Sequence, residues 1–269
     1  MSAELKILLR SLRLPTFLEL HEEFARRAEA EAWSLEKYLQ LLAEAELEER
    51  RRRRVLRALK ASHLPPLKTL DTLDQKHLSL KVRRRLPTLL SGDFLASAIN
   101  ILLIGLPGRG KTHLASAIGH RLIHQGYRVL FTPTYSLVQR LLAAKRELQL
   151  ERLIQRLDKF HAVILDDLGY VQQSRDEMEV LFTFLSERYE RRSVILTSNL
   201  VFSQWDRIFK DKITTAAAID RLVHHSVILE MTGPTHRGQE AKRRIDAEQT
   251  DLQDKLRSGE ETSGASSEP

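Results

Sequence analysis

Hydrophobic residues in the first part of the chain recur at helical spacing. Leucines lie three and four positions apart over residues 5–12, and a second amphipathic stretch over 16–31 follows a proline. The segment Ser34–Lys37 resembles a capping box and predicts the start of a long helix that continues through the arginine-rich residues after it. Two consecutive prolines mark where that helix has ended. We therefore expect a small all-α N-terminal domain over residues 1–62.

From residue 99 onward the pattern changes, because short apolar runs alternate with stretches of helical spacing. Buried parallel strands are continuous apolar runs of this kind, and the alternation is typical of an α/β protein with helices on both faces of a parallel sheet. We predict such a domain over residues 93–245, after a linker and helix over 63–92 and before an acidic, disordered tail over 246–269. The predicted strands are Ile99–Ile104, Val129–Thr132, Ala162–Leu165, Val194–Thr197 and Val227–Glu230.

A glycine-rich loop joins the first of these strands to a helix and fits the pattern G-x-x-x-x-G-K-[ST]. Its glycines let backbone N–H groups point at phosphate oxygens, and the helix that follows adds the positive end of its dipole. In such a loop Lys111 reaches the β- and γ-phosphates of ATP, and the Thr112 hydroxyl takes one position around Mg²⁺. The loop consists of Gly105, Leu106, Pro107, Gly108, Arg109, Gly110, Lys111 and Thr112. Strand, loop and helix together predict an ATP site.

Two more strands end in polar side chains. Asp166 and Asp167 follow an apolar run, and a strand of this kind exposes carboxylates beside the nucleotide in P-loop proteins. We expect Asp166 to hold Mg²⁺, directly or through water, and Asp167 to orient or activate the attacking water. Asn199 ends a strand that should lie between the other two. It is a candidate to hydrogen-bond the γ-phosphate or that water, and a simple strand-to-turn cap explains it equally well.

Arg221 and Arg237 lie before and after the last predicted strand. The guanidinium group is permanently charged, and its fork of donors matches phosphate oxygens. Two such positions are compatible with an arginine finger and a second phosphate sensor. Judged on sequence alone, surface ion pairing is the simpler explanation for both.

Amino-acid composition and net charge exclude several classes of function. The chain has 269 residues, a net charge of +7 and no cysteine, so disulfides and thiol chemistry are excluded. No apolar run approaches the about 20 residues of a membrane span, and the N-terminus does not read as a signal peptide. Positive charge prevails up to residue 245, whereas the tail is acidic. A basic body with an ATP site indicates nucleic acid as a partner, although a basic housekeeping enzyme has the same composition.

Basic residues gather in two segments that are candidates for DNA contact. On a helix, four arginines of the run that begins at residue 50 share one face and form a stripe suited to phosphates. The alternative is a solvated helix whose arginines pair with glutamates one turn earlier. The second segment lies after the second strand and has few aromatic residues, which favours duplex backbone contact over base stacking. The candidate residues are Arg50, Arg53, Arg54, Arg57, Lys145 and Arg146.

Taken together, these motifs resemble those of the AAA+ ATPases. More narrowly, the chain resembles the IstB-type helper ATPases of bacterial insertion sequences, which are related to the DnaC helicase loaders. Matching stretches include residues 110–115, 165–170, 187–190, 197–200 and 220–225. The resemblance implies an AAA+ P-loop NTPase fold in the α/β class, with a five-stranded parallel sheet flanked by helices and preceded by the small all-α domain.

The resemblance also implies roles for individual residues. Asn199 corresponds to sensor I, Arg221 to an arginine that acts on a neighbouring subunit, and Arg237 to sensor II. Lys145 and Arg146 correspond to an extra helix that contacts nucleic acid in the initiator and helicase-loader branch. The departure from the usual sensor II sequence at Thr235–Arg237 weakens that assignment.

The implied function is a cytoplasmic, ATP-dependent DNA-binding protein that oligomerises on duplex DNA. It would assist a cognate transposase in target selection, with ATP and Mg²⁺ as cofactors, ATPase activity stimulated by DNA and assembly, and no membrane partner. A DnaC-like replicative helicase loader is the first alternative, because it shares every ATP-site residue. A small-molecule P-loop kinase and an ATP-gated binding protein with negligible turnover are further alternatives.

Overall fold

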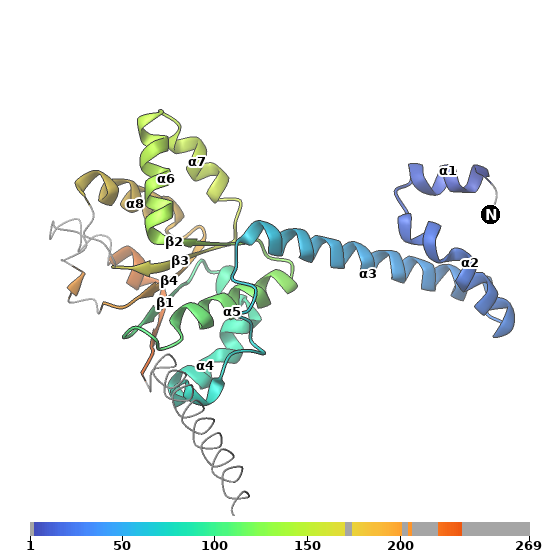
Figure 1. Cartoon of the computed structure of the whole chain (residues 1–269), viewed down its shortest axis with the longest axis horizontal. Coiled ribbons are helices and arrows are strands. Elements are labelled where there is room, and N and C mark those ends of the chain that lie inside the picture. Colours follow the sequence, from blue (N-terminus) through green and yellow to red (C-terminus); the bar gives the residue numbers. More distant parts are fainter. Residues whose placement is uncertain (1–2, 170–173, 201–203, 206–219, 233–269) are drawn as a thin grey trace, which may run out of the picture. The chain divides into compact units, whose positions relative to one another are not determined.

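The computed structural model describes residues 3–169, 174–200, 204–205 and 220–232, which divide into two compact units at Ala61/Ser62. The first unit is helical (Figure 1). It contains α1 (Ala3–Ser11), α2 (Pro15–Ala30) and α3 (Leu35–Ser62), of which only the last residue is assigned to the second unit. The Ser34 hydroxyl accepts a hydrogen bond of 3.1 Å from the Lys37 amide at the start of α3. The predicted capping box is wrong, because the third residue of α3 is a lysine and has no acceptor to return the bond.

The second unit begins at Ser62, so the segment over 63–92 falls in this unit. Its sheet has five parallel strands in the order β2-β3-β4-β1-β5, which agrees with the predicted five-stranded parallel sheet. The strands are β1 (Asn100–Ile104), β2 (Val129–Pro133), β3 (Ala162–Leu168), β4 (Ser193–Ser198) and β5 (Ser226–Glu230). The helices are the 3₁₀ turns η1 (Gln75–His77) and η2 (Asp93–Leu95) and the α-helices α4 (Leu80–Ser91), α5 (Lys111–His124), α6 (Thr134–Arg146), α7 (Leu150–Leu157) and α8 (Arg175–Arg188).

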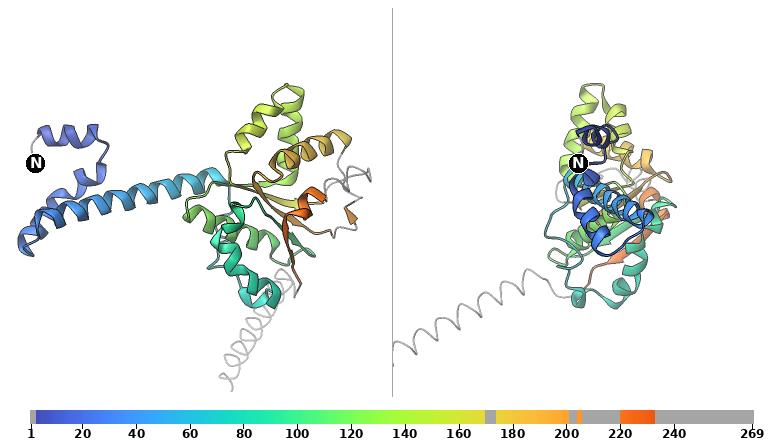
Figure 2. Two further views of the ribbon diagram at one scale, coloured as in Figure 1. Left: turned by 180° about the vertical axis from the view of Figure 1, so that it is seen from behind. Right: turned by 90° about the vertical axis from the view of Figure 1, so that its right-hand side faces the viewer.

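Helices cover both faces of this sheet (Figure 1). Alternate strand residues such as Val163 and Leu165 belong to one core with α6, α7 and α8, whereas α5 packs against β2, β3 and β4 from the other side. The left view in Figure 2 shows the same two layers from behind. Gly119 permits the close approach of α5, because a Cβ there would lie 2.8 Å from Ile164 Cδ1 and 3.0 Å from Leu64 Cδ2. The apolar central residues of β1, β3 and β4 follow from burial on both faces of the sheet.

A buried arginine fixes the sheet's amino edge to the helix before β4. The Arg188 side chain is 1% exposed and donates to the carbonyl oxygens of Leu157 (3.1 Å), Phe160 (3.1 Å) and Ser193 (3.0 Å). Burial lowers the pKa of Arg188 to about 10, although Asp158, 3.6 Å away, opposes the shift. Arg188 thus has a structural role far from the nucleotide loop, because it anchors the connections that enter β3 and β4.

No helix among the described residues is long and apolar enough to cross a bilayer.

Candidate functional site

The glycine-rich loop connects β1 to α5 at the carboxyl edge of the sheet. A Cβ on Gly105 would lie 2.5 Å from the Met231 carbonyl oxygen, so only glycine fits there. Gly108 and Gly110 have φ angles of 77° and 79°, in the left-handed region that favours glycine. Gly110 directly precedes α5, so the loop curls over the amino end of that helix. This backbone fits a chain of phosphates.

Lys111 is the first residue of α5, and its side chain folds back over the loop. Its Nζ donates to the carbonyl oxygens of Gly105 at 2.6 Å and Leu106 at 2.9 Å, and the residue is 8% exposed. The ammonium group is therefore held over the loop backbone, where phosphate oxygens are stronger acceptors than carbonyl groups. The contact of Lys111 with the β- and γ-phosphates of ATP stays a prediction.

Asp166 brings the loop and the middle of the sheet together. Its Oδ1 accepts a hydrogen bond of 2.9 Å from Thr112 Oγ1 and one of 2.7 Å from Thr197 Oγ1. Because β3 and β4 are neighbours, Thr197 stands beside Asp166 although the two lie 31 residues apart. One hydroxyl and one carboxylate oxygen at this place are the hard ligands that Mg²⁺ takes. The residues predicted to hold the metal thus meet in the structure.

Asp166 and Asp167 lie together in a bulge of β3. The pairing of β3 with β4 shifts register between Leu165 and Leu168, and Asp167 adopts a left-handed φ of 65°. Asp167 is exposed, and its amide donates to Thr197 Oγ1 at 2.8 Å. Bulges of this kind re-aim side chains next to active sites. As a result, Asp166 and Asp167 occupy different environments and are suited to different tasks.

Thr197 lies in the candidate site, although the sequence did not single it out. Its hydroxyl contacts both the side chain of Asp166 and the backbone of Asp167, and the residue is only 1% exposed. The sequence did contain a signal for this residue. Thr197 follows an apolar run and stands two positions before Asn199, which was already a candidate. Thr134 makes a further contact, since its hydroxyl donates to the Asp166 carbonyl oxygen at 3.0 Å.

Asn199 follows β4, which lies between β1 and β3 as expected. Its Oδ1 is buried and has no hydrogen-bond partner among the residues that the structure describes. Gly169 leaves room for it, because a Cβ on Gly169 would stand 3.3 Å from that oxygen. A buried polar atom without a partner indicates a position for water or a ligand. This favours the sensor interpretation over a simple turn cap.

Arg221 lies at the opposite edge of the sheet. Its guanidinium group stacks 4.6 Å from the centre of the Phe182 ring and donates to the Ser186 hydroxyl, both on α8. Arg221 also lines a small cavity. Asn100 and Val194, at the amino ends of β1 and β4, line the same cavity. A strand rises about 3.3 Å per residue, so the length of β1 separates this arginine from the nucleotide loop of its own chain. Arg237 lies outside the described residues.

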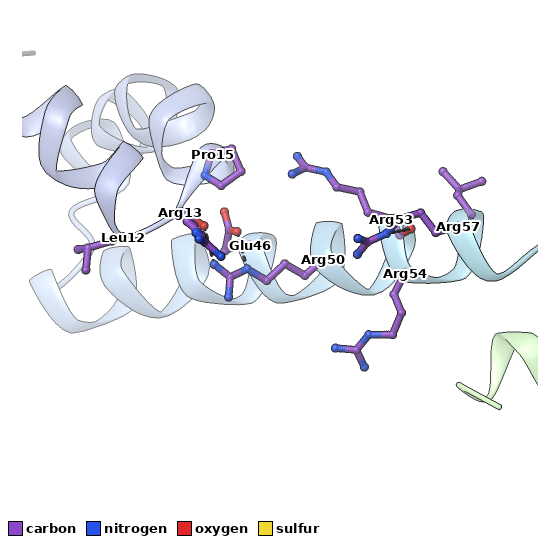
Figure 3. Close-up of a pocket in the computed structure, with 9 residues that line it drawn as sticks. Leu12, Arg13, Pro15, Glu46, Arg50, Arg53, Arg54 and Arg57 are labelled. Atoms are coloured by element: carbon purple, nitrogen blue, oxygen red, sulfur yellow. Dashed lines mark hydrogen bonds and ion pairs between the residues drawn. The ribbon is translucent and has the colours of Figure 1, made fainter. Parts of the chain in front are cut away.

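The predicted arginine stripe forms part of a pocket within the first unit (Figure 3). The pocket has a volume of about 740 Å³. All four predicted arginines line it, together with Arg13 from the turn after α1. The full lining is Leu12, Arg13, Pro15, Glu46, Arg50, Arg53, Arg54, Leu56 and Arg57. One carboxylate among five arginines leaves the pocket strongly positive, which is the charge that a phosphate backbone requires.

Only part of this positive charge is paired inside the chain. Glu46 accepts from Arg50 Nε at 2.7 Å and from the Thr16 amide at 2.8 Å, while Arg53 Nε contacts Glu49 at 2.7 Å. Arg54 and Arg57 have no ion-pair partner within the described part of the chain. The interpretation as a helix with arginine–glutamate pairs therefore applies to Arg50 and Arg53, while DNA contact by the stripe stays a prediction.

The pKa values of the glutamates reflect these contacts. Burial raises the pKa of Glu46, but hydrogen bonds from Arg50 and Thr16 outweigh burial and lower it overall. Hydrogen bonds from Arg52 and Arg53 lower the pKa of Glu49 to about 2. Both carboxylates are thus ionised at neutral pH and hold their arginines in place.

The second basic segment corresponds to α6 and α7. Lys145 forms an ion pair of 2.8 Å with Glu179 on α8, whereas Arg146 is exposed at the end of α6. The pairing of Lys145 leaves Arg146 as the freer cation of the two for a nucleic-acid contact. DNA contact at both residues stays a prediction.

Three comparisons place these features among known proteins. The family model of IstB-like ATP binding proteins matches residues 7–244. An insertion sequence ATP-binding protein of Sinorhizobium fredii is 49% identical over 245 residues, covering 90% of this chain and 82% of the relative. The IS21 ATP-binding protein of Pseudomonas aeruginosa is 36% identical over 243 residues, covering 89% and 91%. The crystal structure of the DnaC helicase loader is similar in fold, with a TM-score of 0.50, 21% identity and coverage of 65% and 99%.

Proposed function

Because the chain belongs to the family of IstB-like ATP-binding proteins, we propose that it is an ATPase that assembles on duplex DNA and assists the transposase of an insertion sequence. The names of its relatives refer to insertion sequences and to ATP binding. An element of this kind needs a transposase to move, and an ATP-dependent partner can decide where it acts. The transposase is therefore the protein partner that we propose.

At the nucleotide site, each residue has a task that follows from its position. Lys111 opposes the charge of the β- and γ-phosphates, while the loop amides bind the phosphate oxygens. Thr112 and Asp166 would hold Mg²⁺, which neutralises charge that develops on the phosphates. Asp167 positions the attacking water, and the Asn199 oxygen, which has no partner among the described residues, accepts from that water or from a protonated group beside it.

The position of Arg221 is the observation that carries the proposal of oligomerisation. It lies at the edge of the sheet opposite its own nucleotide loop, so it can complete only the site of another copy. An arginine finger supplied by a neighbour stabilises charge on the transferred phosphoryl group and accelerates hydrolysis by about 10³–10⁵. ATP hydrolysis then depends on assembly, and DNA stimulates hydrolysis by assembling the subunits.

DNA binding is assigned to the arginine pocket of the first unit, with Arg146 as a second contact. Phosphate contacts without base readout give similar affinity for unrelated duplexes and a steep dependence on salt. Arg54 and Arg57 are the clearest candidates, because neither has an ion-pair partner within the described residues.

A mixing experiment tests the central proposal. Arg221→Ala and Lys111→Ala are each expected to hydrolyse ATP poorly, the first because the finger is lost and the second because ATP no longer binds. Mixed on duplex DNA, they should recover part of the activity, since an intact Arg221 can face an intact loop. Arg121→Ala, an exposed arginine at the end of α5, is the matched control and should resemble the wild type. If both variants assemble on DNA and mixing restores nothing, Arg221 does not act between subunits.

A further inference from the structure

Two adjacent histidines and a glutamate converge beside the segment that carries Arg221. His224 ends a short helical stretch, His225 follows in a turn, and Glu190 lies just after α8. One ligand atom from each of Glu190, His224 and His225 lies within 4.8 Å of the others. Among the described residues this is the single group of three His, Cys, Asp or Glu side chains with so compact an arrangement.

The convergence of the two histidines is unusual for neighbours in sequence. Successive residues of a helix point about 100° apart, yet the His224 and His225 rings have centroids 4.4 Å apart. The turn at His225 brings them together, and its Nε2 lies 3.0 Å from Glu190 Oε1.

Glu190 follows the end of α8 with a left-handed φ of 56°, the conformation in which Leu148 also follows α6. Tyr189 adds a hydroxyl 3.2 Å from His224 Nδ1. The turn after α8 thus places the Glu190 carboxylate beside the two histidines.

We propose that Glu190, His224 and His225 form a binding site for a divalent transition-metal ion of the Zn²⁺ class. Two imidazoles and one carboxylate are a ligand set that zinc takes when water completes its tetrahedron. Zinc–ligand distances of about 2.0–2.2 Å require ligand atoms roughly 3.4 Å apart. The most distant pair of ligand atoms therefore needs to close by up to about 1.4 Å, which the exposed Glu190 and His224 can do by rotation.

The bound ion would join two elements of the second unit. Glu190 follows α8, whereas His224 and His225 belong to the segment that leads into β5. Arg221 lies three residues before His224 and already contacts Phe182 and Ser186 on α8. A metal at this place would fix the segment of the arginine finger against α8. The effect of the metal on the arginine finger rests on the proposed function, whereas the metal site itself does not depend on that function.

Zinc binding by the metal-free full-length protein tests the site without ATP or DNA. We expect one Zn²⁺ per chain in a calorimetric titration, reversed by a chelator. Co²⁺ at the same site should give the visible absorption of tetrahedral coordination. His225→Ala should weaken Zn²⁺ binding at least tenfold. Glu190→Gln should also weaken Zn²⁺ binding at least tenfold, because the amide is a poor metal ligand. This variant keeps a hydrogen-bond acceptor for His225, so its thermal unfolding in the absence of metal should equal that of the wild type.

His124→Ala is the matched control, because this exposed histidine at the end of α5 lies outside the cluster. It should bind Zn²⁺ as the wild type does. The proposal is overturned if the wild type binds Zn²⁺ no more tightly than His225→Ala, if Glu190→Gln retains full affinity, or if His124→Ala loses as much as the cluster variants. Since no step of this test involves ATP hydrolysis, its failure leaves the proposed ATPase untouched, and failure of the mixing experiment leaves the metal site untouched.

Discussion

Replacing Thr197 by valine removes one hydroxyl and almost no volume, so it isolates the contribution of that hydroxyl to the nucleotide site. The hydroxyl donates to Asp166 Oδ1 at 2.7 Å and accepts from the Asp167 amide at 2.8 Å. When Thr112 turns towards Mg²⁺, Thr197 is the side chain that keeps the Asp166 carboxylate oriented. Thr197→Val is therefore expected to disturb both carboxylates at once.

The expected magnitude follows from the burial of these groups. Thr197 is 1% exposed, but the Asp167 amide lies at a partly exposed bulge, so its loss of a partner costs towards the lower end of the usual range. We expect a loss of about 1–2 kcal/mol in the free energy of unfolding. For a unit of this size that loss lowers Tm by about 2–8 °C. Misorientation of Asp166 should lower kcat about tenfold, which is about 1.4 kcal/mol of barrier.

Steady-state ATPase assays and thermal unfolding measure the two effects, and Thr197→Ser supplies the control. Serine keeps the hydroxyl and loses only a methyl group, so it should retain most of the activity. ATP affinity should stay near the wild-type value in both variants, since Lys111 and the loop are intact. Wild-type kcat in Thr197→Val, or equal loss in the serine and valine variants, would show that the hydroxyl does not position Asp166.

Further predictions concern the loop, the pocket and the buried ions. Lys111→Ala should abolish binding of a fluorescent ATP analogue, because it removes the charge held over the loop. Arg54→Ala and Arg57→Ala should each lower the slope of log affinity against log salt by about 1, measured on two unrelated duplexes, whereas Arg52→Ala, which pairs with Glu49 outside the pocket, should not. Glu46→Gln should destabilise the protein by about 1.5–3 kcal/mol. Since the pKa of Glu46 is lowered in the folded state, its contribution is fully present above the ordinary glutamate value of 4.5 and is lost as the pH falls through the lowered pKa, so unfolding curves of the wild type and the variant should converge in acid. Arg188→Met should cost at least about 3 kcal/mol in the full chain, because three carbonyl oxygens lose their donor and Asp158 is left with its ion pair to Arg191. A smaller effect would mean that water replaces the guanidinium group.

The local pattern of hydrophobic and polar residues was sufficient to predict the strands, the helices and the nucleotide-binding loop. Strand and helix positions agree closely with the apolar periodicity, because burial on two faces demands continuous apolar runs and burial on one face demands helical spacing. The loop that ends in Lys111 was predictable because its function depends on backbone conformation, which neighbouring glycines determine.

What the sequence could not determine depends on contacts between distant segments. Thr112 and Asp166 are 54 residues apart, and Thr197 joins them only because β4 is inserted between β3 and β1. The motifs predicted that β4 lies between β1 and β3, but no local pattern specified which side chains meet across these strands, since those contacts depend on the register of strand pairing. The bulge that separates the roles of Asp166 and Asp167 arises from the same pairing.

The same reason applies to the charged side chains. Sequence spacing allowed each arginine of α3 either a glutamate partner or solvent, and tertiary contacts to Thr16 and Arg13 selected Glu46 and Arg50 as a pair. Arg221 was recognisable by its motif, but its place at the amino edge of the sheet was not. Sequence by itself determined which chemical groups this protein carries and which elements hold them. The tertiary structure decided which of those groups meet, because burial and strand pairing act between residues that the chain keeps far apart.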